Sequence, residues 1–150
     1  MKVYSYYVLD IVHRGHLLQM QNAKAVAGPN GKSIVGILTK EAVLEKKPKK
    51  PILSFDERMN LAQSIKYVDF VVPQNTYSPI PNLQSIRPNV CMESDSHVGG
   101  DIEKVKEYMK SIGGEVVVTP YYPYQSSTKI KRSIRRKSIK HKKIGDIDTK

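Results

Sequence analysis

The feature that most constrains the fold is a regular alternation of short apolar runs with segments of helical periodicity. Runs rich in β-branched and aromatic residues are typical of strands. Segments whose apolar residues recur every three or four positions are typical of helices. Strands are predicted at 2–8, 33–38, 69–73, 89–92 and 115–119, and helices at 15–27, 39–45, 54–68, 83–86, 102–112 and from 126 onward. This alternation predicts an α/β fold with a parallel five-stranded sheet, right-handed crossovers and helices on both faces.

The composition is that of an ordinary globular domain. The 150 residues suffice for one hydrophobic core, and 39% of them are hydrophobic. No apolar run is long enough to span a membrane, and no signal segment is recognisable. The single cysteine, Cys91, lies in an apolar stretch, which indicates a buried structural role and excludes an internal disulfide framework. These features predict a cytoplasmic protein without a membrane partner.

The net charge of +11 is concentrated at the C-terminal end. Residues 129–150 hold ten Lys or Arg against two acidic residues. A basic tail can bind nucleic acid or anionic lipid, but this one has no interleaved aromatic residues and no nucleic-acid motif. We therefore predict a domain at 1–137 followed by a solvated, disordered basic tail at 138–150, with nucleic acid as the less favoured partner.

The motif His13-Arg14-Gly15-His16 lies where the first strand leads into the first helix. Free N–H groups and the helix dipole favour a phosphate at such a position. The glycine allows close approach of the backbone, and each imidazole can donate a hydrogen bond to a phosphate oxygen. The alternatives are two histidines without a role, or half of a metal site. Zinc is less favoured because the other ligand types lack suitable spacing.

Three other polar clusters follow predicted strands. Residues 46–51 are lysines and prolines only, which is typical either of a solvated loop or of a mobile loop that brings ammonium groups to a polyphosphate. Asp95 follows the fourth strand, and the run 126–128, Ser-Ser-Thr, begins the last helix. The carboxyl ends of parallel strands meet at one edge of a sheet, where ligands bind. We therefore expect these clusters to converge with the histidine motif.

Five segments together resemble the cytidylyltransferase-like branch of the nucleotidyltransferase superfamily. They are the strand with its H-x-G-H motif and the stretches GILTKEAVLEKK, SFDERMNLAQSIKYVDFVV, PNVCMESDS and SSTKIKRSI. The resemblance covers residues 1–137 and includes glycerol-3-phosphate, phosphocholine and phosphoethanolamine cytidylyltransferases. It implies a Rossmann-like nucleotidyltransferase fold. It also implies transfer of a nucleotidyl group from CTP to a phosphate or phosphonate oxygen, with Mg²⁺ and release of pyrophosphate, in an enzyme that is often a homodimer.

The resemblance also implies roles for individual residues. His13 and His16 would contact the triphosphate and stabilise charge at the α-phosphate, and Lys46 would neutralise it. The remaining residues that it assigns to the nucleotide are Val8, Leu9, Asp10, Gly15, Asp95, Ser126, Ser127 and Thr128. Those that it assigns to the acceptor are Lys49, Lys50, Arg58, Lys66, Tyr77 and Tyr121.

The chain departs from the family pattern at three places. The Gly-Thr-Phe-Asp sequence of the family is Tyr-Val-Leu-Asp at 7–10, its Gly-Asp-Asp-Trp segment is Glu-Ser-Asp-Ser at 93–96, and the arginine before the Ser/Thr motif is Tyr121. The cytidylyltransferases of phosphonate pathways also lack Gly-Thr-Phe. The first expectation is therefore a small phosphonate acceptor, such as 2-hydroxyethylphosphonate or 2-aminoethylphosphonate. The alternatives are an alcohol phosphate, adenylyl transfer to FMN or a pantetheine phosphate, and a non-catalytic nucleotide or nucleic-acid binder.

Overall fold

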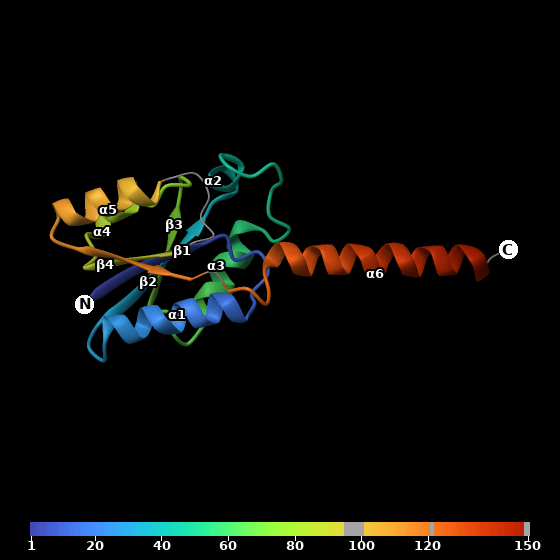
Figure 1. Ribbon diagram of the computed structural model, residues 1–150, viewed down its shortest axis with the longest axis horizontal. Helices are drawn as coiled ribbons and strands as arrows, with labels where there is room; N and C mark the ends of the chain where they lie inside the picture. The colour runs from blue at the N-terminus through green and yellow to red at the C-terminus, as the bar shows by residue number, and fades with distance from the viewer. Residues whose placement is uncertain (95–100, 121, 149–150) are drawn as a thin grey trace.

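The computed structural model describes residues 1–94, 101–120 and 122–148, with side chains up to residue 139. Strands and helices alternate along most of the chain (Figure 1). The strands are β1 (Lys2–Tyr7), β2 (Lys32–Leu38), β3 (Phe70–Gln74), β4 (Val90–Ser94) and β5 (Glu115–Thr119). The helices are α1 (Arg14–Ala27), α2 (Lys40–Leu44), α3 (Phe55–Gln63), α4 (Ile80–Ile86), α5 (Ile102–Ser111) and α6 (Ser127–Asp148).

The five strands form one sheet in the order β3-β2-β1-β4-β5, and every neighbouring pair is parallel. The central strand β1 pairs with β2 through Tyr4 and Ile34, and with β4 through Tyr4 and Cys91. This confirms the predicted Rossmann-like α/β fold. Strands β2 and β3 lie on one side of β1, and the strands that follow β3 lie on the other side. This arrangement places the ends of β1 and β4 at a switch point, where ligands of such sheets bind.

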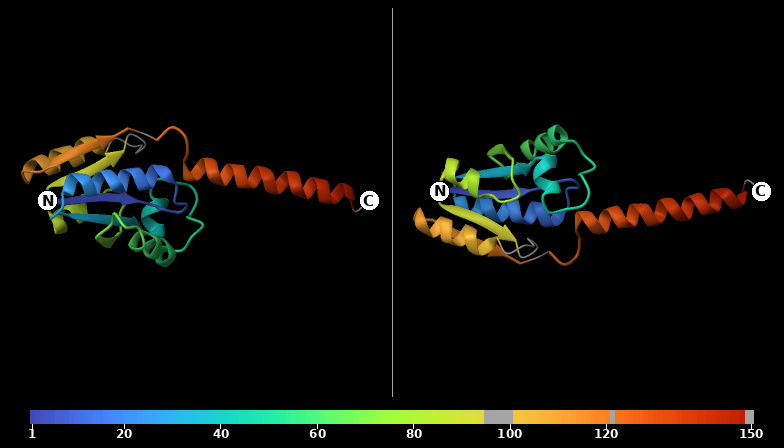
Figure 2. Two further views of the ribbon diagram at one scale, coloured as in Figure 1. Left: turned by 90° about the horizontal axis from the view of Figure 1, so that it is seen from below. Right: turned by 90° about the horizontal axis from the view of Figure 1, so that it is seen from above.

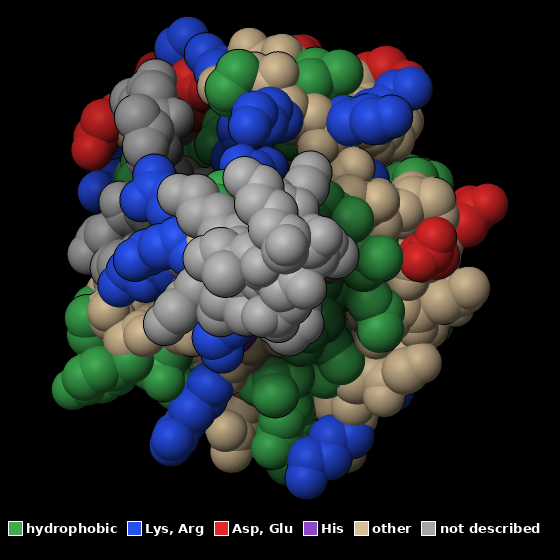
Figure 3. Space-filling model, turned by 90° about the vertical axis from the view of Figure 1, so that its right-hand side faces the viewer, with side chains coloured by type: hydrophobic (Ala, Val, Ile, Leu, Met, Phe, Trp, Pro, Cys, Tyr) green, Lys and Arg blue, Asp and Glu red, His purple; other side chains and the backbone are tan. Residues whose placement is uncertain are grey.

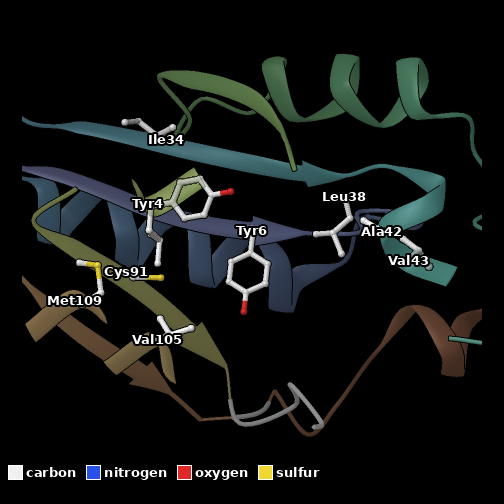
Figure 4. Packing of buried hydrophobic residues seen from close by; sticks show 10 residues of the cluster. Tyr4, Tyr6, Ile34, Leu38, Ala42, Val43, Cys91, Val105 and Met109 are labelled. Atoms are coloured by element: carbon white, nitrogen blue, oxygen red, sulfur yellow. The ribbon is translucent and has the colours of Figure 1, made fainter. Parts of the chain in front are cut away.

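The two faces of the sheet are covered by different helices because successive residues of a strand point to opposite sides. Tyr4 and Tyr6 of β1 pack with Leu83 of α4 and with Val105 and Met109 of α5 (Figure 4). The neighbouring positions of β1 face α1 and α3, where they bury Met20 and Ala23 of α1 and Ala62 of α3. Helices lie on both faces of the sheet, as predicted (Figure 2). The core therefore consists of two apolar layers separated by the sheet.

The ends of several elements differ from the sequence prediction. Helix α4 begins at Ile80, earlier than the expected turn at 83–86, because Pro81 lies in its first turn, where a missing N–H costs no hydrogen bond. Helix α6 extends to Asp148 and projects from the sheet along the longest axis of the molecule (Figure 1). It therefore continues through most of the segment expected to be a disordered tail. No helix in the described part of the chain is long and apolar enough to cross a membrane.

Candidate active site

A cavity of about 1290 Å³ lies at the carboxyl ends of the parallel strands. It is lined by the end of β1 and the turn after it, by the start of α1, by residues 46–51 after α2, and by the first turns of α6. These segments are far apart along the chain. The sheet order brings them together at the edge where the polar clusters were expected to meet.

Most of the residues that the sequence singles out line this cavity. They are Val8, Leu9, Asp10, His13, Gly15, His16, Lys46, Lys49, Lys50, Tyr77, Ser126, Ser127 and Thr128. Two others, Asp95 and Tyr121, lie outside the residues that the structure describes. The expected convergence of the histidine motif, the lysine loop and the Ser/Thr run is therefore present as a single cavity.

The two histidines fix each other's position at the N-terminus of α1. His13 is the N-cap residue, and its Nδ1 accepts a hydrogen bond from the N–H of Gly15 at 3.1 Å. The Nδ1 of His16 accepts one from the N–H of His13 at 3.3 Å, which completes a reciprocal capping box. Because Nδ1 is the acceptor in both rings, each neutral imidazole carries its proton on Nε2. Each ring therefore keeps an Nε2–H donor for a bound anion.

Both imidazoles are held in the neutral state at physiological pH. Burial is the largest cause that lowers the pKa of His16, and together with the nearby His13 and Lys47 it brings this pKa to about 3. Burial also lowers the pKa of His13. In the absence of a ligand the histidines are therefore neutral hydrogen-bond donors, and the positive charge of the cavity comes from its lysines and arginines.

Gly15 leaves room for the His13 ring beside Tyr122. A Cβ atom at residue 15 would lie 2.8 Å from Cε1 of His13 and 3.0 Å from Cδ1 of Tyr122. The Tyr122 ring lies parallel to the His13 ring, with centroids 6.4 Å apart and an interplanar angle of 15°. Any side chain at this position would displace one of the two rings. The absence of a side chain at Gly15 therefore allows the His13 ring to take this position beside Tyr122.

Asp10 joins three segments of the site. Its buried carboxylate accepts hydrogen bonds from the N–H groups of Ile52 at 2.8 Å and Leu53 at 2.7 Å, and it pairs with the ammonium group of Lys131 on α6. Burial acts to raise the pKa of Asp10, but these three partners outweigh it and the pKa lies below its usual value. Asp10 lines the cavity, yet its oxygens are engaged. It acts here as a positioning residue for the lysine loop and α6.

The start of α6 presents hydroxyl and N–H groups to the cavity. The Oγ of Ser126 accepts a hydrogen bond from the N–H of Lys129 at 3.1 Å, as an N-cap does. The Oγ of Ser127 donates to the carbonyl of Ile11 at 2.9 Å, which ties α6 to the turn after β1. N–H groups in the first turn of a helix have no acceptor within the helix. Those of Ser127 and Thr128 therefore suit a phosphate.

Two residues expected to bind the acceptor lie away from the cavity, and the structure corrects their placement. Arg58 on α3 is fully buried, and its Nη1 donates to the carbonyls of Val8 at 2.8 Å and Leu38 at 2.6 Å. It stabilises the carboxyl ends of β1 and β2. Lys66 is exposed beyond the end of α3, with its Nζ 5.1 Å from the centroid of the Tyr67 ring. Neither residue lines the cavity.

Sequence reasoning missed several residues that line the cavity, among them Lys47, Tyr122 and, on α6, Lys131, Arg132 and Arg135. Lys47 belongs to the predicted loop, but nothing in the pattern distinguishes it from its neighbours. Lys131 follows Thr128 by three positions, so the helical period of α6 was an available signal for it. Tyr122 lies in an irregular loop, where no period indicates which tyrosine points to the site.

The described residues provide no metal site of their own. They contain no group of three His, Cys, Asp or Glu side chains placed to hold an ion. Among the described residues that line the cavity, the only carboxylate side chain is Asp10, whose oxygens are engaged. Among the described lining residues, no carboxylate is therefore free to bind a Mg²⁺ ion that accompanies a nucleotide, whereas phosphate oxygens and water are common ligands of Mg²⁺.

Comparison with known proteins identifies the family. A family model described as cytidylyltransferase-like matches residues 8–133, from the end of β1 into α6. The chain belongs to the cytidylyltransferase-like family. The match contains the H-x-G-H motif, the lysine loop and the Ser/Thr run, so this family member has its candidate site within the matched region. The resemblance inferred from the motifs is thereby confirmed at the level of the nucleotidyltransferase superfamily.

Relatives of this family member differ in length. The bifunctional protein HldE of Alcanivorax borkumensis is 33% identical over 133 residues, which cover 85% of this chain and 26% of HldE. The FAD synthase of Korarchaeum cryptofilum is 29% identical over 126 residues, which cover 83% of this chain and 85% of that protein. The chain therefore spans about a quarter of HldE but most of the FAD synthase.

A solved structure supports the fold. The lipopolysaccharide core biosynthesis protein from Thermoplasma volcanium superposes with a TM-score of 0.66. The two chains are 18% identical, and the match covers 83% of this chain and 98% of the other. At this identity the likeness shows a shared fold and carries no information on the substrate.

Proposed function

We propose that the protein transfers a cytidylyl group from CTP to an oxygen of a small phosphonate, such as 2-hydroxyethylphosphonate or 2-aminoethylphosphonate, and releases pyrophosphate. One observation carries the nucleotidyl transfer in this proposal, and the choice of CTP and a phosphonate rests on the resemblance of the sequence motifs. The Nε2–H donors of His13 and His16 line the same basic cavity as the first turn of α6, so hydrogen-bond donors and positive charge surround the space that a triphosphate would fill.

In the proposed reaction an acceptor oxygen attacks the α-phosphorus of the nucleotide. The new bond joins that oxygen to the α-phosphorus, the bond from the α-phosphorus to the bridging oxygen breaks, and pyrophosphate leaves with the electron pair. Negative charge grows on the α-phosphate oxygens and on the leaving group. Donors already fixed in place stabilise this charge without reorganising. No protein side chain needs to act as a nucleophile.

Different residues of the cavity would stabilise the α-phosphate and the terminal phosphates. The Nε2–H groups of His13 and His16 stabilise the oxygens around the α-phosphorus, and Lys46 neutralises charge on the same phosphate. Ser127 and Thr128 hold the terminal phosphates through the first-turn N–H groups of α6. Catalysis then consists of positioning and electrostatics. In this proposal the nucleotide binds as its Mg²⁺ complex. The protein is expected to be a cytoplasmic homodimer.

A second candidate is adenylyl transfer from ATP. The observation that favours it is the relative named FAD synthase, because FAD contains an adenylyl group. An alcohol phosphate, such as glycerol-3-phosphate, phosphocholine or phosphoethanolamine, is the corresponding alternative for the acceptor. The reacting groups of the protein would be the same in each case, so only the nucleotide and acceptor pockets distinguish these candidates.

Pyrophosphate release tests the proposal. The protein is incubated with Mg²⁺ and either CTP or ATP, and with each of the two phosphonates, three alcohol phosphates and FMN in turn. Release with CTP and one phosphonate is the expected result. Turnover with ATP alone would establish the adenylyl alternative in its place. Absence of release with every pair would contradict an enzymatic role for this set of substrates.

A further inference from the structure

One face of α6 presents basic side chains to the cavity beyond the first turn of the helix. Thr128, Lys131, Arg132 and Arg135 all line the cavity. They are spaced at i, i+3, i+4 and i+7, which places them on one side of the helix. Lys131 is engaged by Asp10. Arg132 and Arg135 are exposed, and among the contacts of the described residues no ion pair engages either guanidinium.

The lysine loop approaches the same face of α6. The N–H groups of Ile52 and Leu53 and the ammonium group of Lys131 all bind the carboxylate of Asp10. This shared contact holds the end of the loop against the helix. The charge of Lys131 also acts to lower the pKa of Lys47, after the larger effect of burial, so the loop and the helix approach within electrostatic range. Lys and Arg side chains are numerous on the side of the molecule from which α6 projects (Figure 3).

Arg135 lies further along α6 than the N-terminal phosphate site. With a rise of about 1.5 Å per residue, Arg135 lies about 10 Å along the axis from Thr128. A phosphate held by the N–H groups of the first turn is thus separated from Arg135 by about two turns. A second anionic group in the same cavity would fit between the arginines and Lys49 or Lys50 of the loop, which also line it.

We propose that Arg132 and Arg135 bind the phosphoryl or phosphonate group of the acceptor and so determine which acceptors are used. This inference rests on the proposed function, because it assigns the second substrate of the same reaction. A guanidinium group matches a phosphate or phosphonate dianion with paired donors, and it keeps its charge at all working pH values. The acceptor is therefore a compact molecule with a terminal dianionic group.

The neighbouring Arg136 provides a matched control. It is exposed and carries the same side chain, but it is not among the residues that line the cavity. Arg135→Ala and Arg136→Ala change the net charge equally at adjacent positions of one helix. A difference between the two variants therefore reports contact with a ligand in the cavity rather than the overall charge of α6. Arg135→Lys retains the charge but loses the paired donors.

The test is calorimetric titration of the full chain with inorganic phosphate as the probe. The triphosphate site is first saturated with a non-hydrolysable analogue of CTP or ATP, whichever binds. We expect Arg135→Ala and Arg132→Ala to weaken phosphate binding by about tenfold or more, Arg135→Lys to weaken it less, and Arg136→Ala to leave it unchanged. In turnover, Arg135→Ala should raise the KM of the acceptor and leave that of the nucleotide unchanged.

Equal phosphate affinities of Arg135→Ala and Arg136→Ala would overturn this inference and leave the proposed function standing. So would an equal loss of single-stranded RNA binding in both variants without a change in phosphate binding, since that pattern assigns the arginines to a polyanion along the helix. If neither analogue binds the unaltered protein, the proposed function fails, and the acceptor site fails with it.

Discussion

At the scale of residues, the two histidines serve the fold and the proposed chemistry with different ring nitrogens. Nδ1 of each ring accepts a backbone N–H and fixes the imidazole at the start of α1. Nε2 stays available as a donor. The H-x-G-H spacing achieves this because positions three apart meet on a helix, and because Gly15 leaves space for the His13 ring. Local folding therefore prepares the donors before any ligand binds.

Replacing His16 separates these two roles. We expect His16→Ala to remain folded and to lower turnover by about 100-fold or more, because it removes a donor from the developing charge. His16→Asn retains an acceptor near the position of Nδ1, so it should keep the helix cap while losing the Nε2–H. Steady-state rates and denaturation of both variants provide the measurement. Turnover close to that of the unaltered protein would refute the proposed role of His16.

The lowered pKa of His16 predicts a dependence of stability on pH. The unfolded chain takes up a proton near the ordinary histidine pKa of about 6.5, whereas the folded state resists protonation until about pH 3. The free energy of unfolding should therefore fall as the pH decreases below about 6.5, by up to about 1.4 kcal/mol per pH unit from this group. His13 contributes with the same sign.

Chemical denaturation at about pH 7 and about pH 5 measures this effect. Carboxyl groups such as Asp10, whose pKa is lowered, remain ionised in the folded state over this interval. The unaltered protein should lose more stability between the two pH values than His16→Asn, which lacks the titrating group. Equal losses would show that His16 is as easily protonated in the folded state as in the unfolded chain.

At the scale of elements, Asp10 connects the turn after β1 to the lysine loop and to α6. Asp10→Asn keeps the shape but removes the charge, and it places an amide group against two N–H donors and an ammonium group. We expect the free energy of unfolding to fall by about 2–3 kcal/mol. Hydrogen exchange at the amides of Ile52 and Leu53 should accelerate, because these amides lose their acceptors.

Glu103→Gln is the matched control for this substitution. Its carboxylate is 83% exposed and forms only a surface pair with Lys106 at 3.5 Å, so the change should have little effect. Unchanged protection of Ile52 and Leu53 in Asp10→Asn would show that the loop is held by other contacts.

Helix α3 shows where sequence reasoning succeeds and where it fails. Its position and its Ser54 cap follow from the sequence, and the Oγ of Ser54 accepts the N–H of Glu57 at 3.2 Å. The family resemblance assigned Arg58 to the acceptor, whereas the structure buries its side chain away from the cavity. Arg58 precedes the buried Ala62 by four positions, so the helical period places both on the inner face. The partners of its guanidinium group are the carbonyl groups of Val8, Leu38 and Leu53, and no local sequence pattern reveals these contacts.

At the scale of the whole molecule, the order of the strands creates the site. Sequence periodicity was sufficient to predict five parallel strands and the convergence of polar clusters at their carboxyl ends. It could not predict that Asp10 forms an ion pair with Lys131, because these residues are 121 positions apart in the sequence. The sequence pattern was also insufficient to predict the acceptor. In the proposed site, the acceptor is selected by side chains of α6 and the lysine loop, and their relative positions depend on the tertiary structure.

The far end of α6 is predicted to be dispensable for turnover. The cavity-lining face of the helix extends to Arg135, so removal of 138–150 leaves each described lining residue in the chain. We expect this deletion to retain the kcat/KM of the unaltered protein. A protein whose function is nucleic-acid binding would instead lose salt-sensitive affinity for RNA or DNA with the tail. Rates and RNA binding measured on the same deletion distinguish these outcomes.

The central claim is that an acceptor oxygen attacks the α-phosphorus of the nucleotide in this cavity. It is tested most directly by using an acceptor whose phosphoryl or phosphonate oxygens are labelled with ¹⁸O, and by locating the label through phosphorus NMR and mass spectrometry. The account predicts ¹⁸O in the bridge between the acceptor phosphorus and the α-phosphorus, and unlabelled pyrophosphate. A bridge without label, or no nucleotidyl transfer to any acceptor, would contradict it.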